Sequence, residues 1–309
     1  MPGAPPAGPE ARAGDMTIRF DDRVALVTGA GKGLGRAYAL WLAKRGAKVV
    51  VNNRVHSGVP SSADAVVEEI RAAGGIAAAD SNSVESEEGS HAMIQTAYDA
   101  FGRLDILICN AAIALHDAPF ASIDLQAFRQ VMDINFWGTI YPMHAAFARM
   151  QAAQYGRIVL TSSHIGLWGQ RGASAYGASK GALIGFARSV GAEGFRQNVI
   201  VNIVAPTAFT AMWPVASDHA PLMPADKAAP LIGWLSSSGC DRSGMIFNVG
   251  AGGVQRVQIQ QGRVVDIPDQ EISLSWPELL EFAEGTEPRN SVSSLTDLFA
   301  RAQTRYAKA

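Results

Sequence analysis

The chain is poor in cysteine, and its two cysteines, Cys109 and Cys240, lie far apart without a CxxC or metal-type spacing. This pattern argues against a disulfide framework and indicates two buried or reduced thiols in a reducing compartment. The six histidines also lack a His-x-x-x-His spacing with a nearby glutamate. We therefore expect no metal site.

The sequence also has no apolar run near the ~20 residues that a membrane span needs. Its net charge of −2 creates no positive field that would hold nucleic acid or an anionic membrane. Residues 1–16 are rich in proline, glycine and alanine, lack the apolar stretch of a secretory signal, and are expected to form a disordered leader. Because the end of the chain does not resemble a peroxisomal address, we expect a cytoplasmic protein.

A content of 48% hydrophobic and 17% charged residues permits a substantial core, and 309 residues suffice for one large domain with an appendage or two small domains. Apolar runs without polar alternation predict strands at 23–28, 47–52, 104–109, 156–161, 198–204 and 245–249. Helical segments are predicted between them at 34–45, 64–73, 90–101, 124–151, 175–195 and 225–236. This alternation indicates an α/β fold with a doubly wound parallel sheet in a single domain, residues 17–253, whose ligands bind at the carboxyl ends of the strands.

The alternation of predicted strands and helices ends before residues 254–309, which we interpret as a C-terminal extension. Two alternating runs around Gln261-Gly262 predict a hairpin over residues 254–267. Two amphipathic helices are predicted at 275–283 and 294–308. A segment of this size is too small to build its own core, so we expect it to dock on its own domain or on a neighbouring subunit.

A glycine-rich turn follows the first predicted strand and reads Thr28-Gly-Ala-Gly-Lys-Gly-Leu-Gly35. Glycines in such a turn let the backbone approach a pyrophosphate, which rests on the positive start of the next helix. A glycine cluster alone is a weak signal, but here it follows a strand and opens a helix. The predicted phosphate cradle consists of Gly29, Gly31, Lys32, Gly33, Leu34 and Gly35.

Tyr176 and Lys180 are four residues apart, which places them on one face of a helix. An ammonium group beside a phenol favours the phenolate and would lower the pKa of Tyr176 toward working pH. Taken alone, such a pair is more often a surface tyrosine and a solvated lysine. Ser163 lies 13 residues before Tyr176, just after a strand, and Asn135 lies inside a long predicted helix. This combination favours a catalytic site.

Together, these motifs resemble the short-chain dehydrogenase/reductase family over about residues 20–253, and the resemblance implies a Rossmann-type fold. It implies that Tyr176 is the acid/base, that Lys180 lowers its pKa and holds the nicotinamide ribose, and that Ser163 orients the reacting oxygen. Asn135 would support a water-linked proton relay. Beyond the glycine turn, the implied cofactor residues are Asn53, Arg54, Asn82, Ser83, Asn110, Ala111, Tyr176, Lys180, Pro206, Thr207, Ala208 and Thr210.

A narrower resemblance joins FDDRVALVTGAGKGLGRAYAL, YGRIVLTSS and residues 245–253 to the (3R)-hydroxyacyl-CoA dehydrogenase unit of the peroxisomal multifunctional enzymes of β-oxidation. Where that group has an aspartate that reads the cofactor ribose, this chain has Asn53, followed by Arg54. Asparagine cannot repel a 2′-phosphate, and arginine could bind one unless it points to solvent. We therefore expect NAD(P) as cofactor, with NADP slightly favoured over NAD.

The expected activity is hydride transfer between a nicotinamide and a small-molecule ketone or secondary alcohol, with 3-hydroxyacyl-CoA among the candidate substrates. The segment over residues 209–224 is expected to act as the substrate lid. The alternative is a catalytically silent NAD(P)-sensing binding protein of the same fold. The long predicted helices carry more apolar surface than one sheet face can cover, so we expect a homodimer or homotetramer.

Overall fold

The computed structural model describes residues 18–55, 58–115, 118–210, 212 and 222–261. Contacts divide the chain into two compact units, residues 1–255 and 256–309. The predicted leader, the end of the predicted hairpin and both predicted terminal helices lie outside the described residues. Within the described part, no helix is long and apolar enough to cross a membrane.

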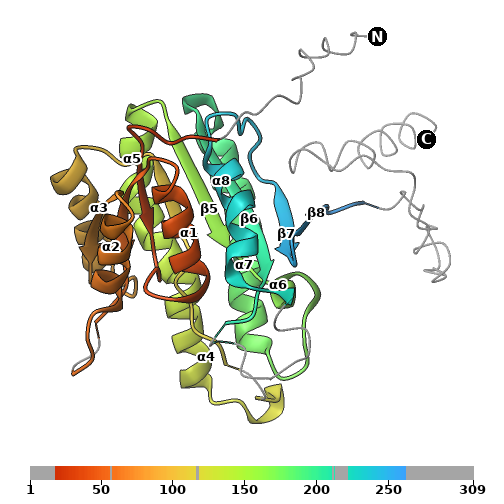
Figure 1. The fold of residues 1–309 in the computed structure, drawn as a ribbon. Coiled ribbons are helices and arrows are strands. Elements are labelled where there is room, and N and C mark those ends of the chain that lie inside the picture. Colours follow the sequence, from red (N-terminus) through yellow and green to blue (C-terminus); the bar gives the residue numbers. More distant parts are fainter. Residues whose placement is uncertain (1–17, 56–57, 116–117, 211, 213–221, 262–309) are drawn as a thin grey trace, which may run out of the picture. The chain divides into compact units, whose positions relative to one another are not determined.

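The described residues form an eight-stranded sheet of order β3-β2-β1-β4-β5-β6-β7-β8 (Figure 1). The strands are β1 Val24–Val27, β2 Lys48–Asn52, β3 Ile76–Asp80, β4 Ile106–Cys109, β5 Gly156–Thr161, β6 Val199–Thr207, β7 Ile246–Gly250 and β8 Gly253–Val257. All pairings from β3 through to β7 are parallel. The central strands are buried along their whole length, as unbroken apolar runs require when helices cover both faces.

Helices lie on both faces of the sheet: α1 contacts α2 and α8, while α3 packs on α5 and α4 packs on α7. The helices are α1 Gly33–Ala43, α2 Ser62–Ala72, α3 Glu87–Phe101, α4 Leu125–Met132, α5 Gly138–Ala152, α6 His164–Trp168, α7 Ser174–Gly194 and α8 Ala229–Ser236. From β1 the chain winds outward to β3 and then crosses to β4 on the other side of β1. A crevice for ligands opens where the strand order reverses in this way.

The predicted doubly wound sheet is confirmed, and all six predicted strands are present. The pattern missed β3, whose sequence Ile-Ala-Ala-Ala-Asp has little of the β-branched character that marks a strand. In the structure β3 pairs in register with β2, from Ile76 opposite Lys48 to Asp80 opposite Asn52. Tertiary pairing therefore decides this element.

One other element differs from the prediction. The predicted helix over 124–151 is interrupted by a π-helical turn, Asp133–Trp137, between α4 and α5. The first strand of the predicted hairpin over 254–267 coincides largely with β8, which lies beside β7, and the rest of that hairpin from Gly262 onward lies outside the described residues. The turn between these two strands contains Ala251 and Gly252, both with positive φ. Cys109 and Cys240 are buried and free, as expected.

Candidate active site

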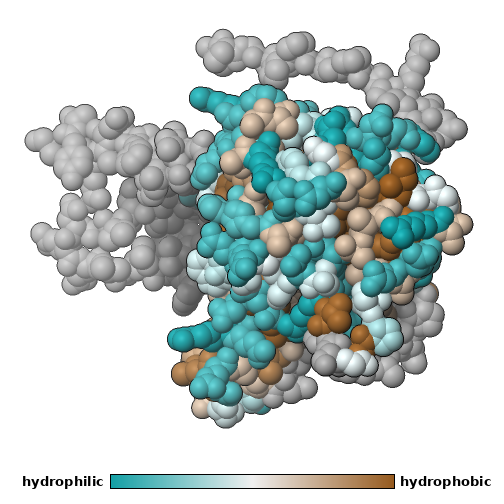
Figure 2. All heavy atoms as spheres, turned by 90° about the vertical axis from the view of Figure 1, so that its left-hand side faces the viewer, coloured by the Kyte–Doolittle hydropathy of each residue, from teal (hydrophilic) through white to brown (hydrophobic). Residues whose placement is uncertain are grey.

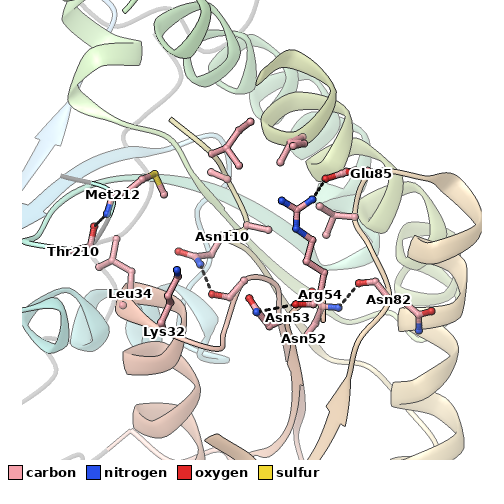
Figure 3. Close-up of a pocket in the computed structure, with 17 residues that line it drawn as sticks. Lys32, Leu34, Asn52, Asn53, Arg54, Asn82, Glu85, Asn110, Thr210 and Met212 are labelled. Carbon is pink, nitrogen blue, oxygen red and sulfur yellow. Dashed lines mark hydrogen bonds and ion pairs between the residues drawn. The ribbon is translucent and has the colours of Figure 1, made fainter. Parts of the chain in front are cut away.

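Two adjoining hollows lie at the carboxyl ends of the central strands. The first, which we call the nucleotide cleft, runs from the turn after β1 past the ends of β2, β3 and β4 (Figure 3). The second, which we call the reaction pocket, is a cavity of about 590 Å³ beyond β5 and β6. They share the lining residues Leu34, Asn110, Ala112, Thr210 and Met212. An elongated ligand could therefore occupy both.

The turn after β1 fits a bound pyrophosphate. Gly29 and Gly33 have φ of +64° and +56°, which only glycine adopts without strain. A Cβ on Gly35 would come within 2.7 Å of the Asn110 amide nitrogen, so this close approach also needs glycine. At the start of α1, Lys32 makes no side-chain capping hydrogen bond and the first turn has no acidic residue. Its backbone N–H groups are thus suited to an anion.

Other helix starts in the same domain differ from α1. The helices α2, α3 and α4 are each capped by a side chain, from Ser61, Ser86 and Asp124 respectively. Such caps satisfy backbone N–H groups that a ligand would otherwise bind. The contrast singles out the start of α1 as the anion site among these four helices.

The ends of β1 and β4 are tied together by Thr28 and Asn110. The Thr28 hydroxyl accepts the backbone N–H groups of Asn110 at 2.9 Å and Ala111 at 3.0 Å. In return, the Asn110 amide donates to the carbonyls of Thr28 at 3.1 Å and Gly29 at 3.3 Å. This network fixes the glycine turn against the neighbouring strand, so Asn110 lines the cleft and also shapes it.

A buried carboxylate, Asp80, holds the far side of the nucleotide cleft. It accepts hydrogen bonds from the side chains of Asn52 at 2.6 Å, Asn82 at 2.7 Å and Thr96 at 2.8 Å. Asn82 lines the cleft as predicted. The sequence missed the role of Asp80 because it ends β3, the strand that the pattern did not reveal.

Asn53 and Arg54 both line the nucleotide cleft. The Asn53 amide donates to the Ser62 hydroxyl at 2.9 Å. Arg54 extends from the end of β2 and forms an ion pair with Glu85, which comes from the loop before α3 (Figure 3). Arg54 therefore does not point freely into solvent. Glu85 was missed, since only the fold brings the two loops together.

Lys180 is buried with 2% of its surface exposed, and its ammonium donates to the carbonyl of Thr161 at 2.7 Å. Burial lowers the pKa of Lys180 to about 8, because removal from water disfavours the charged form. The ammonium nitrogen lies 6.0 Å from the centre of the Tyr176 ring. The helical pair predicted from the sequence thus faces one pocket.

Tyr176 lies half-buried in the reaction pocket and hydrogen-bonds with Ser163. Burial raises the pKa of the Tyr176 phenol, and the bond with Ser163 opposes that rise. The net rise of the Tyr176 pKa is opposite to the lowering expected from Lys180, and the two causes that act on it are burial and Ser163. The phenol is well suited to hold a proton until a developing negative charge takes it.

Asn135 sits in the π-helical turn and is completely buried. Its side-chain oxygen accepts the N–H of Ile113 at 2.8 Å, and its amide donates to the Ile113 carbonyl at 2.9 Å and the Ser179 hydroxyl at 3.1 Å. Ser179 in turn donates to the Tyr176 carbonyl at 2.8 Å. Asn135 thereby links the end of β4 to the catalytic helix, and its role in a water relay stays a prediction.

Both the sequence and the fold are similar to those of known proteins. A family model described as short chain dehydrogenase matches residues 23–219. The chain belongs to the short-chain dehydrogenase family. It is therefore an oxidoreductase of a family that works with nicotinamide cofactors.

Some relatives are longer proteins than this chain. Peroxisomal multifunctional enzyme A of Dictyostelium discoideum is 37% identical over 302 residues, which cover 94% of this chain and 68% of that protein. Peroxisomal multifunctional enzyme type 2 of Drosophila melanogaster is 42% identical over 260 residues, 81% of this chain and 42% of that protein. The solved full-length Drosophila enzyme matches with a TM-score of 0.78 and 32% identity over 93% of this chain and 50% of that one. The chain thus spans about half of the solved enzyme.

Most predicted site residues of the dehydrogenase line one of the hollows. Those in the nucleotide cleft are Gly29, Lys32, Gly33, Leu34, Asn53, Arg54, Asn82, Asn110, Ala111 and Thr210. Those in the reaction pocket are Ser163, Tyr176, Lys180, Pro206, Thr207, Ala208 and Thr210. Gly31, Gly35, Ser83 and Asn135 do not line either hollow. Gly31 and Gly35 allow close packing beneath the turn, and the Ser83 hydroxyl accepts the Glu85 N–H at 3.2 Å.

The sequence missed several walls of the reaction pocket, among them Trp168, Gly169 and Gln170 after β5. Their position just beyond a strand end was the available signal, because ligand-binding loops follow strand ends in this architecture. Of the expected lid over residues 209–224, residues 211 and 213–221 lie outside the described part. Its base is closed where the Phe209 N–H donates to the Met223 carbonyl at 2.8 Å.

The buried Lys180 predicts a pH-dependent stability. Between pH 8 and its ordinary pKa of 10.5, the unfolded dehydrogenase holds a Lys180 proton that the folded protein has released. Raising the pH through this window should therefore increase the free energy of unfolding of wild type relative to that of Lys180→Met, by up to ~1.4 kcal/mol per pH unit. Below pH 8 the difference in unfolding free energy between the two proteins should not change with pH. Urea unfolding of both proteins from pH 7 to 10.5 measures this. Lys44→Met, at an exposed lysine, is the control, and a flat Lys180 difference would contradict the assignment.

Proposed function

We propose that this dehydrogenase interconverts a ketone and a secondary alcohol on a substrate of the 3-hydroxyacyl thioester type. The observation that carries the proposal is the reaction pocket, in which Tyr176, Ser163 and Lys180 face a large cavity with apolar walls. The resemblance to hydroxyacyl-CoA dehydrogenase units supports this substrate class. The nucleotide cleft, with its glycine turn and the uncapped start of α1, supports the binding of a dinucleotide beside it.

A nicotinamide held beside Lys180, Pro206 and Thr210 would supply the hydride for the carbonyl carbon in reduction and accept it in oxidation. In reduction, Tyr176 donates its proton to the carbonyl oxygen, and Ser163, its hydrogen-bond partner, holds the same oxygen. The phenolate that remains is stabilised by the positive charge of Lys180, whose ammonium is fixed by the Thr161 carbonyl. In oxidation the same residues act in the opposite direction, and the Tyr176 phenolate accepts the proton of the alcohol.

The shape of the reaction pocket supports a bulky, partly apolar substrate. Its walls include Ile165, Trp168, Phe209, Met212 and Met223, and its volume of about 590 Å³ is shared between the substrate and the nicotinamide end of the cofactor. Trp168 is 69% exposed, so one wall reaches the surface, where a long substrate could extend outward.

The first test is Tyr176→Phe, which removes the proton donor but keeps the ring. We expect kcat for a 3-oxoacyl thioester to fall below about a tenth of wild type, a loss of at least ~1.4 kcal/mol, while cofactor affinity stays close to unchanged. Steady-state kinetics and cofactor titration measure the two quantities. A variant that retains more activity would show that Tyr176 is not the acid. A wild type that binds cofactor but turns over no carbonyl compound would favour the alternative, a silent NAD(P) sensor.

We also propose that both cofactors bind, with NADP mildly favoured. Arg54 lines the cleft and could bind a 2′-phosphate, but Glu85 already pairs with it. Both side chains are about 40% exposed (42% and 40%), so water weakens their attraction and the arginine can change partner. Glu85 at the same time repels a phosphate. The balance of these two effects limits the preference.

This balance predicts opposite effects of two substitutions. Glu85→Gln should raise the NADPH/NADH ratio of kcat/KM by up to about fivefold, and Arg54→Leu should lower it by a similar factor, each worth up to ~1 kcal/mol because both groups are exposed. Steady-state kinetics with both cofactors measure the ratio. Glu88→Gln, at an exposed acid on α3 that does not line the cleft, is the matched control. An unchanged ratio in Arg54→Leu would refute the role of the arginine.

We propose a homodimer or homotetramer as the working state. Support comes from the surface of α4, the π-helical turn and α5, where Leu125 is 71% and Trp137 44% exposed. Trp137 stacks on Tyr141 with ring centres 5.6 Å apart. A surface with aromatic side chains of this kind is typical of protein interfaces.

Cytoplasm remains the proposed compartment on composition alone, although the relatives described above are named peroxisomal.

Light scattering tests the oligomer. Wild type should have at least twice the monomer mass of 32.6 kDa, and Trp137→Glu should shift it toward the monomer because a charge in an apolar interface is costly. Trp234→Glu, at a similarly exposed tryptophan on α8, controls for loss of stability (43% exposed). A monomeric wild type would defeat the proposal, and an unshifted Trp137→Glu would place the interface elsewhere.

A further inference from the structure

We propose that Glu87, His91 and His144 form a binding site for a divalent transition-metal ion such as Zn²⁺. One ligand atom from each residue, a carboxylate oxygen or a ring nitrogen, lies within 4.8 Å of the other two. His91 Nε2 is 3.8 Å from a carboxylate oxygen of Glu87. The three residues lie on α3 and α5, outside both the nucleotide cleft and the reaction pocket. Within the described part of the chain, they are the one cluster of this kind.

The residue types decide which ion would bind. Two imidazoles and one carboxylate are a common ligand set for Zn²⁺, and imidazole also suits Ni²⁺ and Cu²⁺. Ca²⁺ and Mg²⁺ need more oxygen ligands than this cluster offers. Three protein ligands leave a fourth position for water, as in open zinc sites. The sequence did not reveal the cluster because His144 is far from the Glu-x-x-x-His pair along the chain.

Packing between the two helices holds the ligands in place. One turn beyond His91, Gln95 on α3 accepts a hydrogen bond from Arg149 on α5 at 3.1 Å. The Arg149 guanidinium also lies 4.4 Å from the ring centre of Tyr98. Since α3 and α5 are in contact, the backbone geometry of the site exists before an ion arrives.

Two features limit the affinity. All three ligands are exposed in the single chain, so an ion must compete with water for them, and His144 lies on the same face of α5 as Tyr141 of the proposed subunit surface. Glu87 is the first residue of α3, where the positive end of the helix dipole opposes a cation. Figure 2, which views the molecule from the side of α2 and α3, shows a mainly hydrophilic surface that an ion can reach. We therefore expect a dissociation constant on the order of micromolar.

The experiment is a Zn²⁺ titration of the full chain by calorimetry, with Co²⁺ absorption as a second readout of a low-coordinate nitrogen and oxygen site. We expect His144→Ala, His91→Ala and Glu87→Gln each to weaken Zn²⁺ binding at this site by at least about tenfold. Glu88→Gln, at the adjacent acid of the same helix, is the matched control and should bind as wild type does. Because the ion joins two helices, saturating Zn²⁺ should raise Tm of wild type but not of His144→Ala.

His144 gives the sharpest outcome because it is the single ligand from α5. If His144→Ala binds Zn²⁺ as wild type does, or shows the same rise in Tm, the cross-helix site does not exist. Circular dichroism and turnover without added metal verify that each variant folds, since none of these residues lies in the catalytic machinery. Binding that is absent from wild type at millimolar Zn²⁺ would equally overturn the proposal.

Discussion

The site depends first on the hydrogen-bonded junction between β1 and β4. Thr28 and Asn110 exchange contacts across these neighbouring strands, and Gly35 leaves room for the Asn110 amide beneath the turn. Because the sheet reverses its strand order here, the junction sets the position of both hollows. A shift of one strand against the other would separate the anion-binding start of α1 from the catalytic helix α7. The Thr28–Asn110 hydrogen bonds therefore help to fix the distance between the nucleotide cleft and the reaction pocket.

Local patterns predicted most of the fold because its strands are buried on both faces and read as unbroken apolar runs. They failed at β3, whose alanines carry no strand signal, and at the π-helical turn, which has no sequence signature. Because β3 was missed, so were the roles of Asp80, which ends this strand, and of Glu85, which lies in the loop after it. That Tyr176, Lys180 and Ser163 lie close together was predictable, since Tyr176 and Lys180 share a helix and Ser163 follows a strand. Contacts between distant loops were not predictable, because no local spacing encodes them.

Burial controls the chemistry of the catalytic helix more than the neighbouring charge does. Lys180 is held by one carbonyl and loses much of its hydration, so its pKa falls to about 8. The same loss of hydration raises the pKa of Tyr176. Both groups are therefore destabilised in their charged forms, and a proton passed from the phenol leaves a phenolate whose natural partner is the ammonium. Mutual neutralisation relieves the cost of burying each of them alone.

The pair of Arg54 and Glu85 shows how exposure sets the limits of specificity. An ion pair at the surface is worth about 0 to 1 kcal/mol, so Arg54 can leave Glu85 for a phosphate at little cost. The same exposure makes any new bond to that phosphate weak, and the abandoned carboxylate then repels it. An acid in place of Asn53, which is partly buried, would discriminate more strongly, because its charge would be screened less than those of Arg54 and Glu85. A cleft whose charges are screened in this way accommodates both cofactors.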